Sequence, residues 1–203
     1  MLVSELSHRV SNTLAVVQSM AGQTLRTTDT NQNFVDVFEG RLQALARSHN
    51  LLVEARWEGT DFEALVRSHL EAYLGDGPQR LNLHGDPVIL SPDFATPFGL
   101  VLHELATNAA KYGAFSVATG RVVLTWTIDT KNDKRLLKVI WREIGGPPVS
   151  APTRKGFGGS LIERGLPGCH VKREFAPEGL TCTLEIELPK EQDHGIEDRR
   201  IED

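Results

Sequence analysis

The stretch that decides the fold of this chain is LVLHELATNAAKYG, residues 100–113. Leu, Ala and Glu dominate it and favour a helix, and Gly113 is placed to end that helix. The apolar residues recur at spacings of three and four, so they share one face: Leu102, Leu105, Ala106 and Ala109. The stretch therefore predicts an amphipathic helix packed against a core.

A second face of the same helix carries polar side chains. Glu104, Asn108 and Lys111 stand at i, i+4 and i+7, and His103 and Thr107 border them. Carboxylate and amide oxygens suit Mg²⁺, and an ammonium group suits phosphate oxygens. On spacing alone the commoner explanation is a solvated face with a Glu–Lys pattern. A phosphate-binding interpretation therefore needs support from elsewhere in the chain.

Four segments, three of them elsewhere in the chain, supply that support, because they resemble motifs of the HWE group of sensor histidine kinases. HELATNAAKYG, within the stretch quoted above, resembles the N-box of that group. ELSHRVSNTLAVVQ, residues 5–18, resembles its phosphoacceptor box, with Ser11 where Lys is usual. WREIGGPPV, residues 141–149, is similar to the WxExGGPxV box, and GFGGSLIE, residues 156–163, to the second glycine box.

The resemblance implies roles for individual residues. His8 would be the phosphoacceptor, and Glu104 a general base or water-orienting group. Asn108, together with Glu104, would hold Mg²⁺, and Lys111 would neutralise phosphate charge. Glu143 would accept a hydrogen bond from the adenine amino group, since a carboxylate is an acceptor. The other expected nucleotide contacts are His103, Trp141, Gly145, Gly146, Gly156 and Gly158. The cofactors implied are ATP and Mg²⁺.

His8 lies on a predicted helix over residues 2–26. The apolar seam of this helix follows 3–4 spacing through Val3, Leu6, Val10, Thr13, Val17 and Met20, and His8 faces away from it. An exposed histidine near its unperturbed pKa can act as a neutral nucleophile at pH 7. For a lone histidine the alternative is a solvated surface residue. Arg9 follows His8 where many other histidine kinases carry an acidic residue.

A second helix is expected over roughly 33–56, forming an antiparallel hairpin with the first. Its helical period is kept by Phe34, Phe38, Leu42, Leu45, His49 and Leu52. A two-helix hairpin is thin, and its apolar stripe needs more cover. A second copy of the chain would supply it as a four-helix homodimer, which the resemblance also implies. Alternatively, the hairpin folds onto its own ATP-binding domain.

The expected fold class is α+β: a helical hairpin at 1–57, then an ATP-binding domain at 58–189. The resemblance implies a Bergerat-type α/β sandwich, a mixed sheet covered by helices on one face. The elements expected in it are a helix from Thr60 or Asp61 to about Leu74, strand pieces within 79–90, the helix opened by Ser91-Pro92, a hairpin over 121–142, a mobile lid within 143–160, a short helix at 160–164 and a strand pair at 169–175 and 180–188. Residues 190–203 are polar and expected to be disordered.

Composition limits the class of protein. The chain has 203 residues with 40% hydrophobic content, and its net charge of −5 argues against general nucleic-acid binding. No apolar run approaches the roughly 18 residues of a membrane span, and no signal peptide is visible. Cys169 and Cys182 match no metal motif. Reduced thiols fit a cytoplasmic protein.

The expected function is ATP-dependent autophosphorylation of His8, followed by phosphoryl transfer to an Asp of a response regulator receiver domain. The sensor domain is missing from this sequence or separate from it. Two alternatives remain: a phosphotransfer or adaptor protein without ATP binding, and a Bergerat-fold serine kinase of the anti-sigma type. The nucleotide-site residues argue against the first, and the hairpin with His8 argues against the second.

Overall fold

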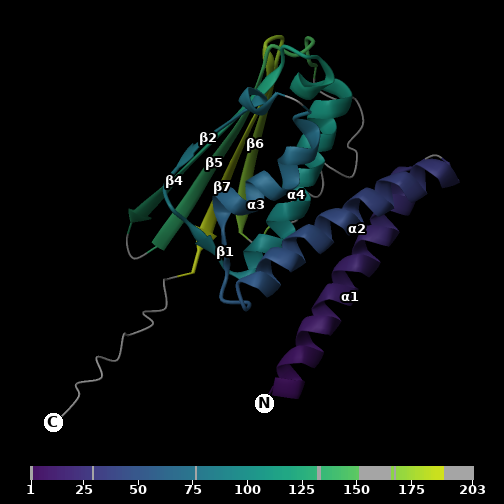
Figure 1. Ribbon diagram of the computed structural model, residues 1–203, viewed down its shortest axis with the longest axis vertical. Helices are drawn as coiled ribbons and strands as arrows, with labels where there is room; N and C mark the ends of the chain where they lie inside the picture. Colours follow the sequence, from purple (N-terminus) through teal and green to yellow (C-terminus); the bar gives the residue numbers. More distant parts are fainter. Residues whose placement is uncertain are drawn as a thin grey trace.

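The chain folds into a helical hairpin and a five-stranded sheet with helices on one face, shown as a computed structural model in Figure 1. The structure describes residues 2–28, 30–75, 77–131, 134–150, 166 and 168–189. The side chains of residues 2–9, Thr27, Pro78 and Lys131 lie outside this description. Most of the expected lid, the short helix at 160–164 and the expected disordered tail also lie outside the described residues.

The hairpin consists of α1 (Leu2–Thr27) and α2 (Asn31–Glu54), as the sequence predicts. Thr30 caps α2, because its side-chain oxygen accepts a hydrogen bond from the backbone N–H of Asn33 at 3.2 Å. The two helices meet through the C-terminal half of α1, where Met20 packs in a small cluster with α2 residues. Val10 and Leu14, nearer the N-terminus, are each 57% exposed. The predicted apolar seam of α1 is therefore covered only in part within one chain.

The buried seam of α2 differs from the predicted one. Leu42 is exposed and His49 half-buried, whereas Arg41 and Ser48, one position earlier in each case, are buried. The helical period through Phe38 and Leu45 predicts Leu42 and His49 on this seam. Adjacent helix positions differ by only about 100°, so a pattern that fits Leu42 nearly fits Arg41 as well. The polar residue of each pair is buried instead, because polar groups of the neighbouring helices lie at these positions and can pair with it.

The sheet has the strand order β2-β4-β5-β7-β6. Its strands are β2 (Leu81–Gly85), β4 (Arg121–Lys131), β5 (Lys134–Ile144), β6 (Cys169–Ala176) and β7 (Gly179–Leu188). β2 runs parallel to β4, and all other neighbours are antiparallel. A separate two-stranded pair joins β1 (Thr60–Asp61) to β3 (Ile89–Leu90). The predicted hairpin over 121–142 and the closing strand pair are confirmed.

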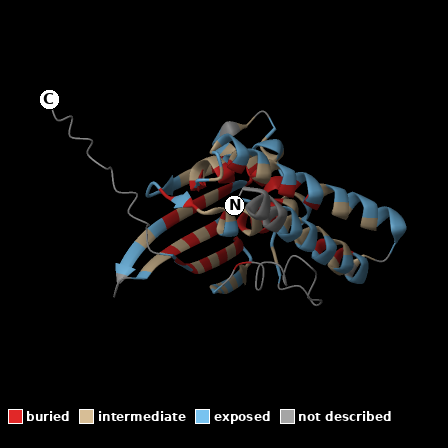
Figure 2. Ribbon diagram, turned by 90° about the horizontal axis from the view of Figure 1, so that it is seen from below, coloured by how far each residue is buried: buried red, intermediate tan, exposed pale blue. Residues whose placement is uncertain are grey.

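One face of the sheet is covered by α3 (Phe62–Leu70) and α4 (Pro92–Tyr112). Asp61 caps α3, which stops at Leu70 instead of the expected Leu74 and continues as a 3₁₀ turn, η1 (Glu71–Tyr73). Short 3₁₀ turns also form η2 (Pro78–Arg80) and η3 (Ala114–Ser116). Figure 2 shows the buried residues gathered between these helices and the sheet, while much of the hairpin is exposed. The α+β class and the one-sided helical cover are confirmed.

Helix α2 also packs against α4, so the hairpin lies on the sheet-bearing part of its own chain. Ala44 and Leu45 of α2 share a buried cluster with Leu100 of α4 and Met20 of α1. The sequence left two arrangements open, a hairpin covered by a second copy and a hairpin folded onto its own chain. The structure shows the hairpin folded onto its own chain. None of the helices among the described residues combines the length and apolar content needed to cross a membrane.

Candidate functional site

The predicted polar face of α4 runs from the interior of the molecule to its surface. Pro92 occupies the first turn of the helix, and the apolar face around Leu105 and Ala106 is buried against the sheet. On the other face Glu104 is buried, Asn108 half-buried and Lys111 exposed. The C-terminal half of α4 therefore presents an amide and an ammonium group toward solvent, as a phosphate-binding face requires.

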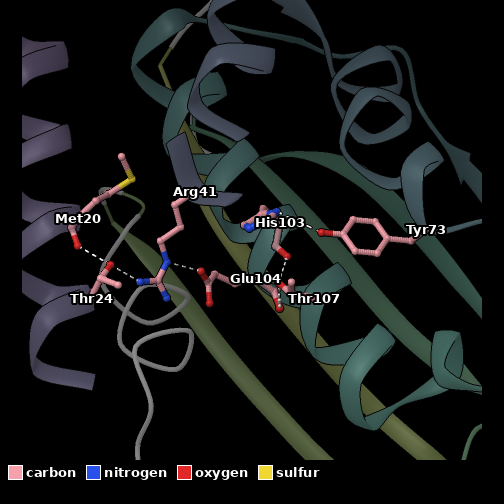
Figure 3. Close-up of polar contacts among 7 residues, drawn as sticks. All are labelled: Met20, Thr24, Arg41, Tyr73, His103, Glu104 and Thr107. Carbon is pink, nitrogen blue, oxygen red and sulfur yellow. Dashed lines mark hydrogen bonds and ion pairs between the residues drawn. The ribbon is translucent and has the colours of Figure 1, made fainter. Parts of the chain in front are cut away.

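Glu104 does not stand free on this face. Its Oε1 accepts a hydrogen bond of 2.7 Å from Nε of Arg41, and both side chains are buried. Arg41 Nη1 donates to Thr24 Oγ1 at 2.5 Å, and the Thr24 hydroxyl donates to the backbone oxygen of Met20 at 2.7 Å. Figure 3 shows this chain of contacts crossing from α1 through α2 to α4.

His103 is buried at the same interface. Its Nδ1 lies 3.3 Å from the hydroxyl of Tyr73 in η1. A Cβ added to Gly40 of α2 would lie 3.3 Å from His103 Nε2, so α2 passes directly over the ring. Burial lowers the pKa of His103 to about 4, helped by the positive charges of Arg47 and then Arg41. The ring is therefore neutral at pH 7, and in this arrangement it contacts protein groups on two sides.

Glu143 lies buried at the end of β5, next to the turn that follows α4. Its Oε2 accepts a hydrogen bond of 2.7 Å from the backbone N–H of Ala114, and its Oε1 accepts one of 3.2 Å from Nε1 of Trp141. Desolvation by burial raises the pKa of Glu143, while these two hydrogen bonds act in the opposite direction. Each carboxylate oxygen has a second lone pair, so the group retains capacity to accept a further donor.

Glycines allow the end of β5 and the turn after α4 to approach each other closely at Glu143. A Cβ added to Gly113 would lie 1.8 Å from Glu143 Oε2. A Cβ on Gly146 would lie 2.9 Å from the backbone nitrogen of Ala114. Gly145 has a φ of +73°, a conformation that favours glycine. The glycines of the WxExGGPxV-like segment thus serve the junction between β5 and η3, which places Glu143 beside the end of α4.

The remaining predicted residues are spread over the molecule. Trp141 is fully buried, with its ring edge-to-face with Phe115 at a centroid distance of 6.4 Å. His8 lies in the second turn of α1, far along the helix from the contacts of Thr24. Gly156 and Gly158 lie outside the described residues.

Sequence reasoning missed Arg41, Thr24 and Tyr73. A signal for Arg41 was present: it continues a 3–4 spacing with Phe38 and Leu45, so it sits on the seam of α2. An arginine on an apolar seam needs a buried acidic partner. No pattern in the sequence identified Glu104 as that partner, since the two residues are 63 positions apart.

The oxygens of Asn108 and Glu104 are chemically suited to Mg²⁺, but within the described part of the chain only the Asn108 oxygen is without an ion-pair partner. No cluster of three or more His, Cys, Asp or Glu side chains that could hold a metal ion occurs among the described residues. Mg²⁺ usually takes one or two protein oxygens and otherwise water and phosphate oxygens. Asn108 can supply such an oxygen, whereas Glu104 is paired with Arg41 in this arrangement.

Comparison with known proteins agrees with these features. A family model described as HWE histidine kinase matches residues 5–87. A blue-light-activated histidine kinase of Brucella anthropi is 36% identical over 189 residues, which cover 91% of this chain and 38% of that protein. The corresponding protein of Brucella ovis is 32% identical over 206 residues, covering 97% of this chain and 42% of the relative. The chain thus spans about two fifths of the length of these relatives.

Solved structures show the same fold. The histidine kinase domain of a blue-light-activated histidine kinase from Erythrobacter litoralis superposes with a TM-score of 0.56 at 15% identity, covering 86% of this chain and 94% of that one. A longer structure of the same protein gives a TM-score of 0.61 at 21% identity, covering 92% of this chain and 59% of that one. Through its matched segment and its relatives the chain is similar to histidine kinases of the HWE type, and its fold is that of the solved histidine kinase structures.

Proposed function

We propose that the chain catalyses ATP-dependent autophosphorylation of His8 and then passes the phosphoryl group to an Asp of a response regulator receiver domain. The observation that carries the proposal is the position of Asn108 and Lys111 at the surface end of α4, next to the buried Glu143. An amide, an ammonium and a buried carboxylate at one end of a helix suit the phosphate and base ends of a nucleotide.

In the proposed reaction a ring nitrogen of His8 attacks the γ-phosphorus of ATP. The new N–P bond forms, the bond from the γ-phosphorus to the bridging oxygen breaks, and ADP leaves. The imidazole proton passes to a base, for which Glu104 is the candidate. Asn108 would hold Mg²⁺, which supplies neutralisation of phosphate charge, and Lys111 would add to it. Phosphoryl transfer depends mainly on such positioning and charge neutralisation.

The same proposal covers assembly and location. Val10, Leu14 and Val35 of the hairpin are between 50% and 57% exposed, which supports a homodimer in which a second copy covers them. Cys169 and Cys182 are free thiols, in keeping with a cytoplasmic site of action. We place the hairpin at 1–57, the ATP-binding domain at 58–189 and a tail at 190–203.

The test is incubation with γ-labelled ATP and Mg²⁺, followed by stability analysis of the label. Wild-type protein should take a label that is acid-labile and alkali-stable, as a phosphoimidazole is. His8→Gln should abolish it, and Asn108→Ala should reduce it strongly. His84 and Asn50 are exposed and far from these residues in sequence, so His84→Gln and Asn50→Ala are matched controls that should label normally.

Two other results would favour the alternatives. If the wild type takes no label but accepts phosphate from a phosphorylated receiver domain, the chain is a phosphotransfer protein. If His8→Gln still passes label to serine on a partner, the chain is a serine kinase of the anti-sigma type. Transfer is tested by adding purified receiver domains to the labelled wild type. Loss of label from the kinase together with gain on the receiver supports the second step.

A further inference from the structure

Arg41 joins three helices at one buried point. Through Nε it donates to Glu104 Oε1 on α4 at 2.7 Å, and through Nη1 to Thr24 Oγ1 on α1 at 2.5 Å. The side chains of Arg41 and Glu104 are only 4% and 10% exposed. Among the described side chains, this ion pair links the helical hairpin to the sheet-bearing part of the chain (Figure 3).

The pairing changes what Glu104 can do. A carboxylate that accepts a charge-assisted hydrogen bond from a guanidinium is turned toward that partner. Asn108 and Lys111 lie one and two turns further along the same face, half-buried and exposed. While the hairpin is docked, Arg41 therefore separates the Glu104 carboxylate from the phosphate-binding groups of Asn108 and Lys111.

The docked hairpin also holds His8 away from the nucleotide end of α4. His8 precedes Thr24 by 16 residues of continuous helix, counted as 24 − 8. At 1.5 Å per residue this separates the two positions by about 24 Å along α1. Figure 1 shows the N-terminus of α1 at the opposite end of the molecule from the C-terminal end of α4. Reacting atoms in phosphoryl transfer must approach to about 3–3.5 Å, so transfer within one chain requires the hairpin to move.

The interface is built in a way that permits separation. Arg47 of α2 carries a buried Nε, and His69 of α3 a buried Nδ1, for which the described residues offer no hydrogen-bond partner. Buried polar atoms without partners weaken an interface, since both would be solvated if it opened. Gly40 and Gly99 allow close helix approach, but the contacts that they permit are to the polar side chains of His103, Ser48 and His69. The Arg41–Glu104 pair is therefore one of the polar contacts that hold the hairpin in place, beside the apolar contacts of Ala44 and Leu45 with Leu100.

We propose that Arg41 is a positioning residue that acts through Glu104 as an autoinhibitory latch. It keeps the hairpin docked on α4 in an arrangement where Glu104 is withdrawn and His8 is distant from the ATP site of its own chain. Release of the latch frees the Glu104 carboxylate and lets the hairpin move. This inference rests on the proposed kinase function and names a regulation of the same site.

The test measures the initial rate of autophosphorylation in four variants of the full chain. Arg41→Gln removes the ion pair and leaves Glu104 buried without it, so we expect a rate increase of at least about tenfold. Thr24→Val removes one hydrogen bond of Arg41 without changing charge, and should give an increase of about threefold. Arg41→Lys keeps the positive charge and should return the rate to near the wild-type value. Arg67→Gln is the matched control, because Arg67 pairs with Glu63 on the surface of α3, and its rate should not change.

The apparent KM for ATP separates a latch from a general loosening of the fold. It should stay the same in Arg41→Gln while the maximal rate rises, because the nucleotide contacts at Asn108 and Lys111 are untouched. A rate in Arg41→Gln that equals or falls below wild type, with the protein folded, overturns the latch. The same conclusion would follow if His8 were labelled by a second copy while the hairpin stays docked. If Arg41→Gln does not fold, Thr24→Val decides by the same criterion.

Amide hydrogen exchange provides a readout that does not need kinase activity. Arg41→Gln should speed exchange at least about tenfold in residues 16–24 of α1 and 38–45 of α2, with the sheet unchanged. Unchanged exchange there overturns the latch. If no variant takes label yet exchange rises in these two segments, the proposed kinase function fails and the docking role of Arg41 stands.

Discussion

The carboxylate of Glu143 accepts a hydrogen bond of 2.7 Å from the backbone N–H of Ala114, just after the glycine that ends α4. Its other oxygen accepts a hydrogen bond of 3.2 Å from the indole of Trp141. The end of β5 is in this way tied to the turn that follows the helix carrying Asn108 and Lys111. The position of the proposed nucleotide face relative to the sheet therefore depends on Glu143.

Replacing Glu143 by Gln should destabilise the fold. The Gln amide group is a donor, so one of the two N–H groups at Ala114 and Trp141 loses its acceptor. A buried donor without a partner costs about 1–3 kcal/mol, which urea denaturation at pH 7 would measure. Glu185→Gln is the control, because it removes only a surface pair with Lys138 and should cost less than about 1 kcal/mol. Equal losses in the two variants would contradict the role given to Glu143.

Gly113→Ala should be far more damaging than its size suggests. The added Cβ would lie 1.8 Å from Glu143 Oε2, so either the carboxylate or the end of α4 must shift. We expect a loss of at least about 2 kcal/mol in unfolding free energy and weaker binding of a fluorescent ATP analogue. Gly22→Ala on α1 meets no atom of the described residues within 4 Å and should stabilise by about 0.5–1 kcal/mol. Similar effects at the two sites would refute the close approach at Gly113.

Arg80 holds the turn between α4 and β4 from the side. Its guanidinium donates to the backbone oxygens of Gly120 at 3.0 Å and Val117 at 2.8 Å, and lies 5.3 Å from the ring centroid of Phe115. Lysine cannot reproduce this fork, so Arg80→Lys should cost about 1–3 kcal/mol in unfolding free energy. Arg121→Lys, at an exposed position of β4, should stay within about 0.5 kcal/mol of wild type. A neutral Arg80→Lys would show that water replaces the fork.

Stability should fall as the pH is lowered from 7 to 5. Burial lowers the pKa of His69 to about 3 and that of His103 to about 4, from an ordinary value of 6.5. The unfolded state therefore binds more protons below pH 6.5, and each histidine removes about 2 kcal/mol of stability by pH 5. The loss continues as the pH falls toward the folded-state values. Urea denaturation at the two pH values measures it.

The matched variants for this prediction are His103→Gln and His84→Gln. The first should remove about half of the pH-dependent loss, since one of two buried histidines is gone. The second should leave the loss unchanged, because His84 is exposed. Glu143 acts with the opposite sign, since its raised pKa favours the folded state at low pH. Glu143→Gln should therefore make the loss between pH 7 and 5 steeper, and a shallower one would contradict its burial.

Local pattern predicted most of the secondary structure. The periodicity of residues 2–26 and 33–56 gave both helices of the hairpin, and Ser91-Pro92 and Gly113 marked the two ends of α4 within a residue. Alternation and turn residues gave the strand pairs of the sheet. These features depend on neighbours in the chain, on backbone geometry and on the apolar period, which a sequence displays directly.

The docking of the hairpin and the partners of the site residues were decided by tertiary structure alone. Helical periodicity could not separate Leu42 from Arg41, and no local signal joined Arg41 to Glu104 across 63 residues. The sequence by itself determined the elements, the motifs and the resemblance to a kinase family. Which buried charge meets which partner depends on how the helices pack, because that energy comes from groups that are distant in the chain and close only in the folded protein.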